Sequence, residues 1–174
     1  MIQRILILCC AVALAGCQTD SKSGTPSPAA FNPNATAHFC GMAVGEHAGP
    51  KGQIWVADES EPVWFSSVRS ALAFTFLPEE PKDIRAIYVT DMAKAADWDK
   101  AATAGWVDAR QAFFVVGADV SGGMGESELI PFSDQGAADD YIRRHGGHVE
   151  RFSDITAQDA LGYSVSANIE SSAR

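Results

Sequence analysis

The sequence predicts an α+β fold of two small ββαβ units that share one core. The main observation is a degenerate internal repeat, because residues 61–66 (EPVWFS) match residues 128–133 (ELIPFS). The spacing of 67 positions is kept further along, where Ala71 corresponds to Ala138. In both copies a short apolar segment leads to a serine that suits a helix N-cap, and a helical pattern follows.

The first unit is predicted to begin after a glycine-rich loop. Ser66 is expected to cap a helix that runs to about Leu77, where Pro78 ends it. The expected strands cover residues 53–56, 62–65 and 84–89.

The second unit repeats this order, with a helix over residues 135–145 that Gly146 and Gly147 end. Its strands are expected over residues 112–116, 128–132 and 148–152. An alanine-rich connector, residues 91–105, lies between the units as a loose helix or a loop. Beyond Ile155 we expect a disordered tail or a short helix around residues 157–161.

The first 16 residues are typical of a lipoprotein signal peptide. Arg4 supplies a positive charge, and residues 5–14 form an apolar run shorter than the roughly 20 residues that span a bilayer. The run ends in Leu14-Ala15-Gly16-Cys17, so we expect cleavage before Cys17 and its lipidation with acyl chains such as palmitate. The alternative is an ordinary secretory signal with Cys17 incidental, although such signals end in an A-x-A-like site.

A flexible tether is expected after the lipid anchor. Residues 19–34 are rich in Ser, Thr, Gly, Pro and Ala and contain too few apolar residues to fold. Gln18 after the cysteine, in place of Asp, resembles an outer-membrane sorting signal of Gram-negative lipoproteins. The predicted division is therefore a signal peptide (1–16), a tether (17–36), a first ββαβ unit with its connector (37–104), a second unit (105–155) and a tail (156–174).

After this processing Cys40 is the one free thiol of the mature chain, because Cys9 and Cys10 leave with the signal peptide and Cys17 carries lipid. This count excludes an intrachain disulfide framework and a two-cysteine redox motif. The formal net charge of −9 and the lack of a basic patch argue against nucleic-acid binding.

Cys40-Gly41-Met42 is the segment that points to chemistry. In an extended stretch, residues two apart face the same side, so a thiolate and a thioether could reach one ion. These soft ligands select a soft ion such as Cu(I). Met124, flanked by glycines in a loop, is a candidate third sulfur ligand. The competing interpretations are a buried cysteine beside a core methionine, and a Met124 that folds back into the core.

The remaining candidates are weaker. His38 lies two residues before Cys40 and could add an imidazole to the same ion, or be solvated. Met92 is expected to pack in the core, and His145 and His148 are expected to lie in a turn, because two glycines separate them. No catalytic triad, phosphate loop or zinc-hydrolase signature is present, so we predict a protein that is not an enzyme.

The order of several motifs resembles the NosL family of nitrous oxide reductase accessory lipoproteins. The resemblance covers about residues 39–154. It rests on Cys40-Gly41-Met42 after a tether, Phe65-Ser66 entering a helix, Tyr88-Val89-Thr90-Asp91 before Trp98, Trp106-Val107-Asp108-Ala109 before a strand, Met124-Gly125, and Pro131-Phe132.

This resemblance implies a lipid-anchored, periplasm-facing Cu(I) chaperone in denitrifying bacteria. Its copper would go to the copper–sulfide centre of apo nitrous oxide reductase, with an ABC-type maturation complex as a second partner. The implied fold is similar to organomercurial lyase, and the implied ligands are Cys40, Met42 and Met124. The chain would act as a monomer or as a dimer bridged by copper.

Two rival functions remain open at this point. One is a thiol-dependent enzyme on the organomercurial lyase fold, but carbon–mercury cleavage is expected to need a pair of cysteines and the mature chain has Cys40 alone. The other is a structural lipoprotein in which Cys40 is buried and inert.

Overall fold

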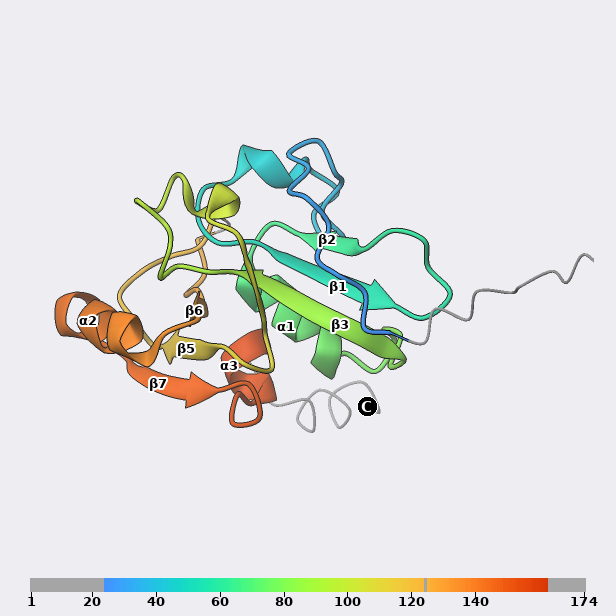
Figure 1. Cartoon of the computed structure of the whole chain (residues 1–174). Helices are drawn as coiled ribbons and strands as arrows, with labels where there is room; N and C mark the ends of the chain where they lie inside the picture. The colour runs from blue at the N-terminus through green and yellow to red at the C-terminus, as the bar shows by residue number, and fades with distance from the viewer. Residues whose placement is uncertain (1–23, 124, 163–174) are drawn as a thin grey trace, which may run out of the picture.

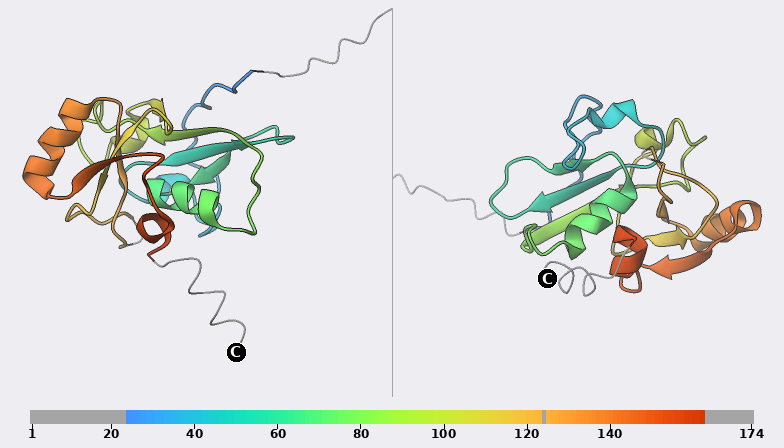
Figure 2. Two further views of the ribbon diagram at one scale, coloured as in Figure 1. Left: turned by 90° about the horizontal axis from the view of Figure 1, so that it is seen from below. Right: turned by 180° about the vertical axis from the view of Figure 1, so that it is seen from behind.

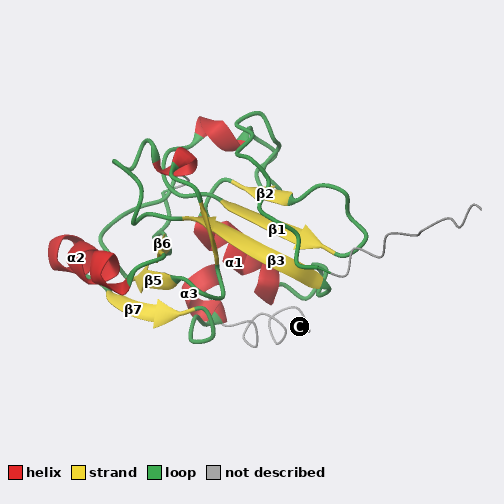
Figure 3. Cartoon of the chain, viewed as in Figure 1, coloured by secondary structure: helices red, strands yellow, loops and turns green. Residues whose placement is uncertain are grey.

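The structure is a computed structural model that describes residues 24–123 and 125–162, and its two small sheets confirm the α+β class (Figure 1, Figure 3). The first sheet has the strand order β2-β1-β3-β4, and all neighbouring strands are antiparallel. Its elements are β1 (Gly52–Val56), β2 (Val63–Phe65), α1 (Val68–Phe76), β3 (Ile84–Thr90) and β4 (Trp106–Asp108).

The second sheet repeats the first with the order β6-β5-β7, again antiparallel. In each unit the first strand lies between the second and third, and the helix connects the second strand to the third. This shared topology confirms the predicted ββαβ repeat. The elements are β5 (Phe113–Val116), β6 (Ile130–Phe132), α2 (Gln135–His145) and β7 (His148–Arg151).

The N-cap residues of the two helices differ from the predicted serines by one position. The N-cap of α1 is Ser67, whose side chain accepts a hydrogen bond from the Ser70 amide, and not Ser66. The N-cap of α2 is Asp134, one residue after the matched serine. The predicted helix ends are confirmed: α1 stops before Pro78, which disfavours helical geometry at Leu77, and α2 stops at Gly146.

β4 was not predicted as part of the first unit. It pairs with β3, and it follows the connector, which contains a 3-10 helix, η2 (Ala101–Thr103). Residues beyond Ile155 form the short helix α3 (Ala157–Leu161), which starts with a reciprocal capping box between Thr156 and Asp159. Of the two outcomes considered for this segment, the structure shows the helix.

The predicted shared core is confirmed. Buried apolar side chains from both units, including Ile54, Leu72, Phe74, Phe114 and Leu129, form one cluster. α1 covers one face of the first sheet, α3 packs against α1, and α2 covers the second sheet (Figure 1, Figure 2). Within the described residues, no helix has the length and apolar composition that a bilayer span requires.

The N-terminal segment, residues 24–37, lies across the face of the first sheet opposite α1 (Figure 1). The buried Gln53 amide exchanges two hydrogen bonds with the Ala29 backbone, at 2.8 and 3.0 Å, and the Tyr88 hydroxyl donates to the Pro26 carbonyl at 2.7 Å. The sequence had placed these residues in a flexible tether. The signal peptide, Cys17 and Gln18 lie outside the described residues.

Candidate metal centre

Cys40 lies at the tip of a tight loop that precedes the first sheet. The Ala37 amide donates to the Met42 carbonyl at 2.8 Å, and the Gly41 amide donates to the Ala37 carbonyl at 2.9 Å. Gly41 has a φ of 68°, a left-handed conformation that glycine adopts without a Cβ penalty. The chain therefore turns between Cys40 and Met42, so the expected extended geometry is wrong.

This loop is held against the edge of the first sheet. The His38 amide donates to the Trp64 carbonyl in β2 at 2.9 Å, and Ala37 forms a parallel bridge with Trp64. Ala37 and Val44 are buried on either side of the loop tip. Because both ends of the loop are fixed, the Cys40 position is set before any ligand binds.

The Cys40 side chain is half-buried and lines a cavity of about 330 Å³, called the Cys40 cavity below. Its Sγ atom lies 3.9 Å from the Oγ atom of Ser66, and either atom can be the donor. The cavity is lined by Ala37, His38, Phe39, Cys40, Phe65, Ser66, Ser70 and Glu126. Cys40 is therefore neither fully exposed nor sealed in the core, and an ion can reach its sulfur.

The loop of residues 121–127 reaches the same cavity through Glu126. Arg69, in the first turn of α1, holds this loop: its Nη1 donates to the Ser127 carbonyl at 2.8 Å, and its Nε lies 3.5 Å from a Glu126 carboxylate oxygen. A Cβ atom on Gly123 would lie 2.5 Å from Cβ of His47, so only glycine fits there. Met124 itself lies outside the described residues.

Met42 does not line the Cys40 cavity. Its side chain is 40% exposed and that of Phe39 is 46% exposed, and these are the exposed large hydrophobic side chains among the described residues. Both belong to the Cys40 loop. The structure therefore brings Cys40, His38 and Glu126 together, and it leaves Met42 on the solvent side of the Cys40 loop.

His38 forms a contact that the sequence did not reveal. Its Nε2 atom lies 2.8 Å from a Glu80 carboxylate oxygen, 42 positions away. The imidazole also packs among three phenylalanine rings, with centroid distances of 4.8 Å to Phe39, 5.2 Å to Phe74 and 5.8 Å to Phe65. An ionised carboxylate only accepts, so Nε2 is the donor, and in the neutral ring Nδ1 keeps its lone pair.

The other histidines and Met92 are not part of the Cys40 cavity. His145 stacks on Tyr141 with ring centroids 4.3 Å apart, and Met92 lines a different cavity beside α2. Gly146 and Gly147 have φ values of 71° and 88°, which confirms the turn predicted between His145 and His148. These residues therefore lie outside the candidate metal centre.

A buried carboxylate lies directly beneath the 121–127 loop. Glu128 accepts hydrogen bonds from the Arg69 and Leu129 amides at 2.8 and 2.9 Å through the same oxygen. Burial raises the pKa of Glu128 to about 7, against these hydrogen bonds and the charges of Lys51 and Arg69. Burial also lowers the pKa of Lys51 to about 8. Sequence reasoning gave no sign of this pair.

Oxygen and nitrogen ligands alone do not build a metal site here. Over residues 24–123 and 125–162, no group of three or more His, Cys, Asp and Glu side chains could hold a metal ion.

Comparison with known proteins identifies the family of this chain. A family model, NosL, matches residues 28–160. The chain belongs to the NosL family.

Two NosL relatives, both described as copper-binding lipoprotein NosL, match most of the chain. The protein from Achromobacter cycloclastes is 37% identical over 154 residues, which are 88% of this chain and 80% of the relative. The protein from Stutzerimonas stutzeri is 32% identical over 152 residues, or 87% of this chain and 78% of the relative.

Two solved NosL structures share the fold. The crystal structure of the copper chaperone NosL from Shewanella denitrificans has a TM-score of 0.69 at 33% identity and covers 75% of this chain and 96% of its own. The solution structure of apo-NosL from Achromobacter cycloclastes has a TM-score of 0.50 at 40% identity and covers 63% of this chain and 88% of its own. The likeness to organomercurial lyase remains a prediction.

Proposed function

We propose that this protein is a lipid-anchored Cu(I) chaperone that holds its copper at Cys40 and delivers it to a partner. The observation that carries the proposal is the half-buried Cys40 thiol, which opens onto a cavity bordered by the loop that contains Met124. The names of the NosL relatives, copper-binding lipoprotein and copper chaperone, support the same function.

The proposed ligands are the Cys40 thiolate and the thioethers of Met42 and Met124, with the His38 imidazole as an additional ligand. Two or three sulfur atoms suffice for Cu(I), which imposes little geometry. Met42 must turn inward from its exposed position, and its location on the solvent side of the loop allows it to contact a partner first. Copper can then pass by ligand exchange, with no catalytic step.

The surface around Cys40 suits docking of a partner protein. Phe39 and Met42 present apolar area on the rim, while Glu126 contributes a largely exposed carboxylate. An apolar rim excludes water when a partner covers it, and the acidic side chain favours a partner with basic residues around its own copper site. The partners we propose are apo nitrous oxide reductase and its ABC-type maturation complex. The lipid anchor of this protein is proposed to lie in the outer membrane, with the folded body facing the periplasm.

The test is competition for Cu(I) between a chromogenic chelator and the reduced protein with Cys17 replaced. We expect Cys40→Ala to lower the affinity by more than about 100-fold, and Met42→Ala and Met124→Ala to lower it by smaller factors. Met92→Ala is the matched control, because Met92 lines another cavity, and its affinity should equal that of the wild type. Equal binding by Cys40→Ala would exclude this site.

A further inference from the structure

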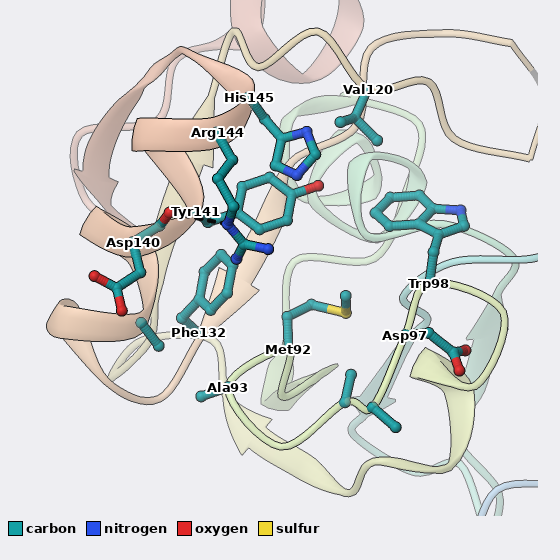
Figure 4. Close-up of a pocket in the computed structure, with 13 residues that line it drawn as sticks. Met92, Ala93, Asp97, Trp98, Val120, Phe132, Asp140, Tyr141, Arg144 and His145 are labelled. Atoms are coloured by element: carbon teal, nitrogen blue, oxygen red, sulfur yellow. Dashed lines mark hydrogen bonds between the residues drawn. The ribbon is translucent and has the colours of Figure 1, made fainter.

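A second cavity of about 470 Å³ lies between the connector and α2, away from the Cys40 cavity (Figure 4). The two cavities share no lining residue. One wall carries Met92 and Trp98 from the connector, and the opposite wall carries Phe132, Tyr141, Arg144 and His145. The volume is in the range of small-molecule sites.

Fixed contacts build this cavity before any ligand binds. The Met92 amide donates to the Pro131 carbonyl at 2.9 Å, and the buried Asp91 carboxylate accepts from the Ser133 amide at 2.9 Å. These bonds join the start of the connector to the end of β6. On the other wall, His145 and Tyr141 are stacked with their ring planes 29° apart. Both walls therefore hold their positions.

The charges around the cavity leave one cation without an acidic partner. Asp97 is paired with Lys100 at 3.1 Å, and Asp140 is paired with Arg143. Arg144 pairs with no carboxylate among the described residues. Its Nε donates to the Asp140 carbonyl at 3.2 Å, and its guanidinium lies 5.7 Å from the Tyr141 ring centroid. The two terminal nitrogens of the guanidinium are thus left to bind an anion.

One further polar group, the Tyr141 hydroxyl, is directed to the same space. The Tyr141 hydroxyl points into the cavity beside the His145 ring, although the residue is only 9% exposed (Figure 4). No described side chain or backbone group forms a hydrogen bond with this hydroxyl. Burial raises the pKa of Tyr141, which keeps the hydroxyl protonated as a donor. Arg144 and Tyr141 therefore both offer donors at one end of an otherwise apolar cavity.

We propose that this cavity binds a small organic anion with an aromatic or branched apolar body. The acidic group of the ligand contacts the guanidinium of Arg144 and the hydroxyl of Tyr141, and its body packs against Met92, Trp98 and Phe132. A carboxylate or a sulfonate group on such a ligand can accept hydrogen bonds from both of these donors. The proposal is independent of the copper function, because neither Cys40 nor any proposed copper ligand lines the cavity.

Fluorescence titration with anilinonaphthalene sulfonate, an aromatic anion, tests this proposal on the full chain. We expect saturable binding at one site. Arg144→Gln should weaken binding at least about tenfold, since it removes a charged hydrogen bond. Arg143→Gln is the matched control, because Arg143 is the adjacent arginine, is paired with Asp140 and does not line the cavity, and it should bind as the wild type does.

Two further measurements exclude other sites and other ligand chemistry. Phe39→Ser removes the exposed ring of the Cys40 loop and should leave dye binding unchanged. Benzoate should displace the dye, and benzyl alcohol, which lacks the charge, should not. The proposal is overturned by dye that does not saturate, by equal losses in both arginine variants, by binding that depends on Phe39, or by equal displacement with benzyl alcohol.

Discussion

The hydrogen bond between His38 and Glu80 determines which ring nitrogen of His38 is available to a metal. Glu80 accepts from Nε2 at 2.8 Å, so the lone pair of the neutral ring is on Nδ1. Histidine ligands of metals commonly donate their other nitrogen to a carboxylate, which fixes the ring orientation. The side chain of Glu80 is 13% exposed, and the three phenylalanine rings around His38 restrict the imidazole further.

We therefore expect Glu80→Gln to weaken Cu(I) binding about tenfold, because the amide no longer selects the Nε2-protonated form. Glu79→Gln is the control, because Glu79 is an exposed neighbour of the same charge. Chelator competition gives the affinity, and nitrogen NMR shifts of His38 report its tautomer. Equal losses in both variants, or an unchanged tautomer in Glu80→Gln, would contradict a positioning role for Glu80.

The residues of the site could be predicted from the sequence only where they are local. The sequence predicts Cys40, His38 and Met42 as candidates from one loop; Cys40 and His38 line the Cys40 cavity, and Met42 does not. Glu80 and Glu126 reach the same place from distant elements, and their positions depend on how α1 and the 121–127 loop pack. No local sequence pattern predicts such contacts, because the sequence does not distinguish a glutamate that is fully solvated from one that contacts another element.

At the scale of elements, strands and helices followed the sequence closely because apolar periodicity and stop residues are local signals. The expected helix over residues 135–145 matches α2 at both ends. β4 was missed as a strand of the first sheet, since its three residues are stabilised by pairing with β3. The N-terminal segment was also missed, because Gln53 and Tyr88 hold its backbone through contacts made only in the folded chain.

The cap of α1 gives a prediction at this scale. Ser67→Ala removes the acceptor of the Ser70 amide and should lower the free energy of unfolding by about 1 kcal/mol. Ser66→Ala, one residue earlier, leaves the cap intact and should lower the free energy of unfolding by less. Urea denaturation of both variants measures the difference. A larger loss in Ser66→Ala would mean that the helix begins at the serine that the repeat first suggested.

At the scale of the whole molecule, two buried charges connect the ββαβ units. Lys51 precedes β1 and donates to the Ala48 and Gly49 carbonyls at 3.1 and 2.8 Å. Glu128 precedes β6 and accepts from the Arg69 amide in α1. Each attracts the other's charge, but desolvation dominates, so the pKa of Glu128 is raised and that of Lys51 is lowered. Packing the units together therefore makes stability depend on pH.

The sign of this dependence follows from proton binding. Glu128 titrates at about 7 in the folded protein and near 4.5 when unfolded, so between these values the folded state binds more protons. The stabilising contribution of protonated Glu128 is complete below pH 4.5 and is lost as the pH rises through 7, by about 3 kcal/mol in total. The contribution of Lys51 to stability has the opposite sign: it rises with pH, in a separate pH window between about 8 and 10.5.

We therefore expect the free energy of unfolding of the wild type, relative to Glu128→Gln, to fall between pH 5 and 7. Glutamine retains an oxygen that can accept from the Arg69 and Leu129 amides but does not ionise, so subtraction removes the titration of every other group. Urea denaturation at several pH values in this range measures the difference. Parallel curves of the free energy of unfolding against pH for the two proteins would contradict the prediction. They would show that the pKa of Glu128 is not raised, because water reaches its carboxylate directly or after the 121–127 loop moves.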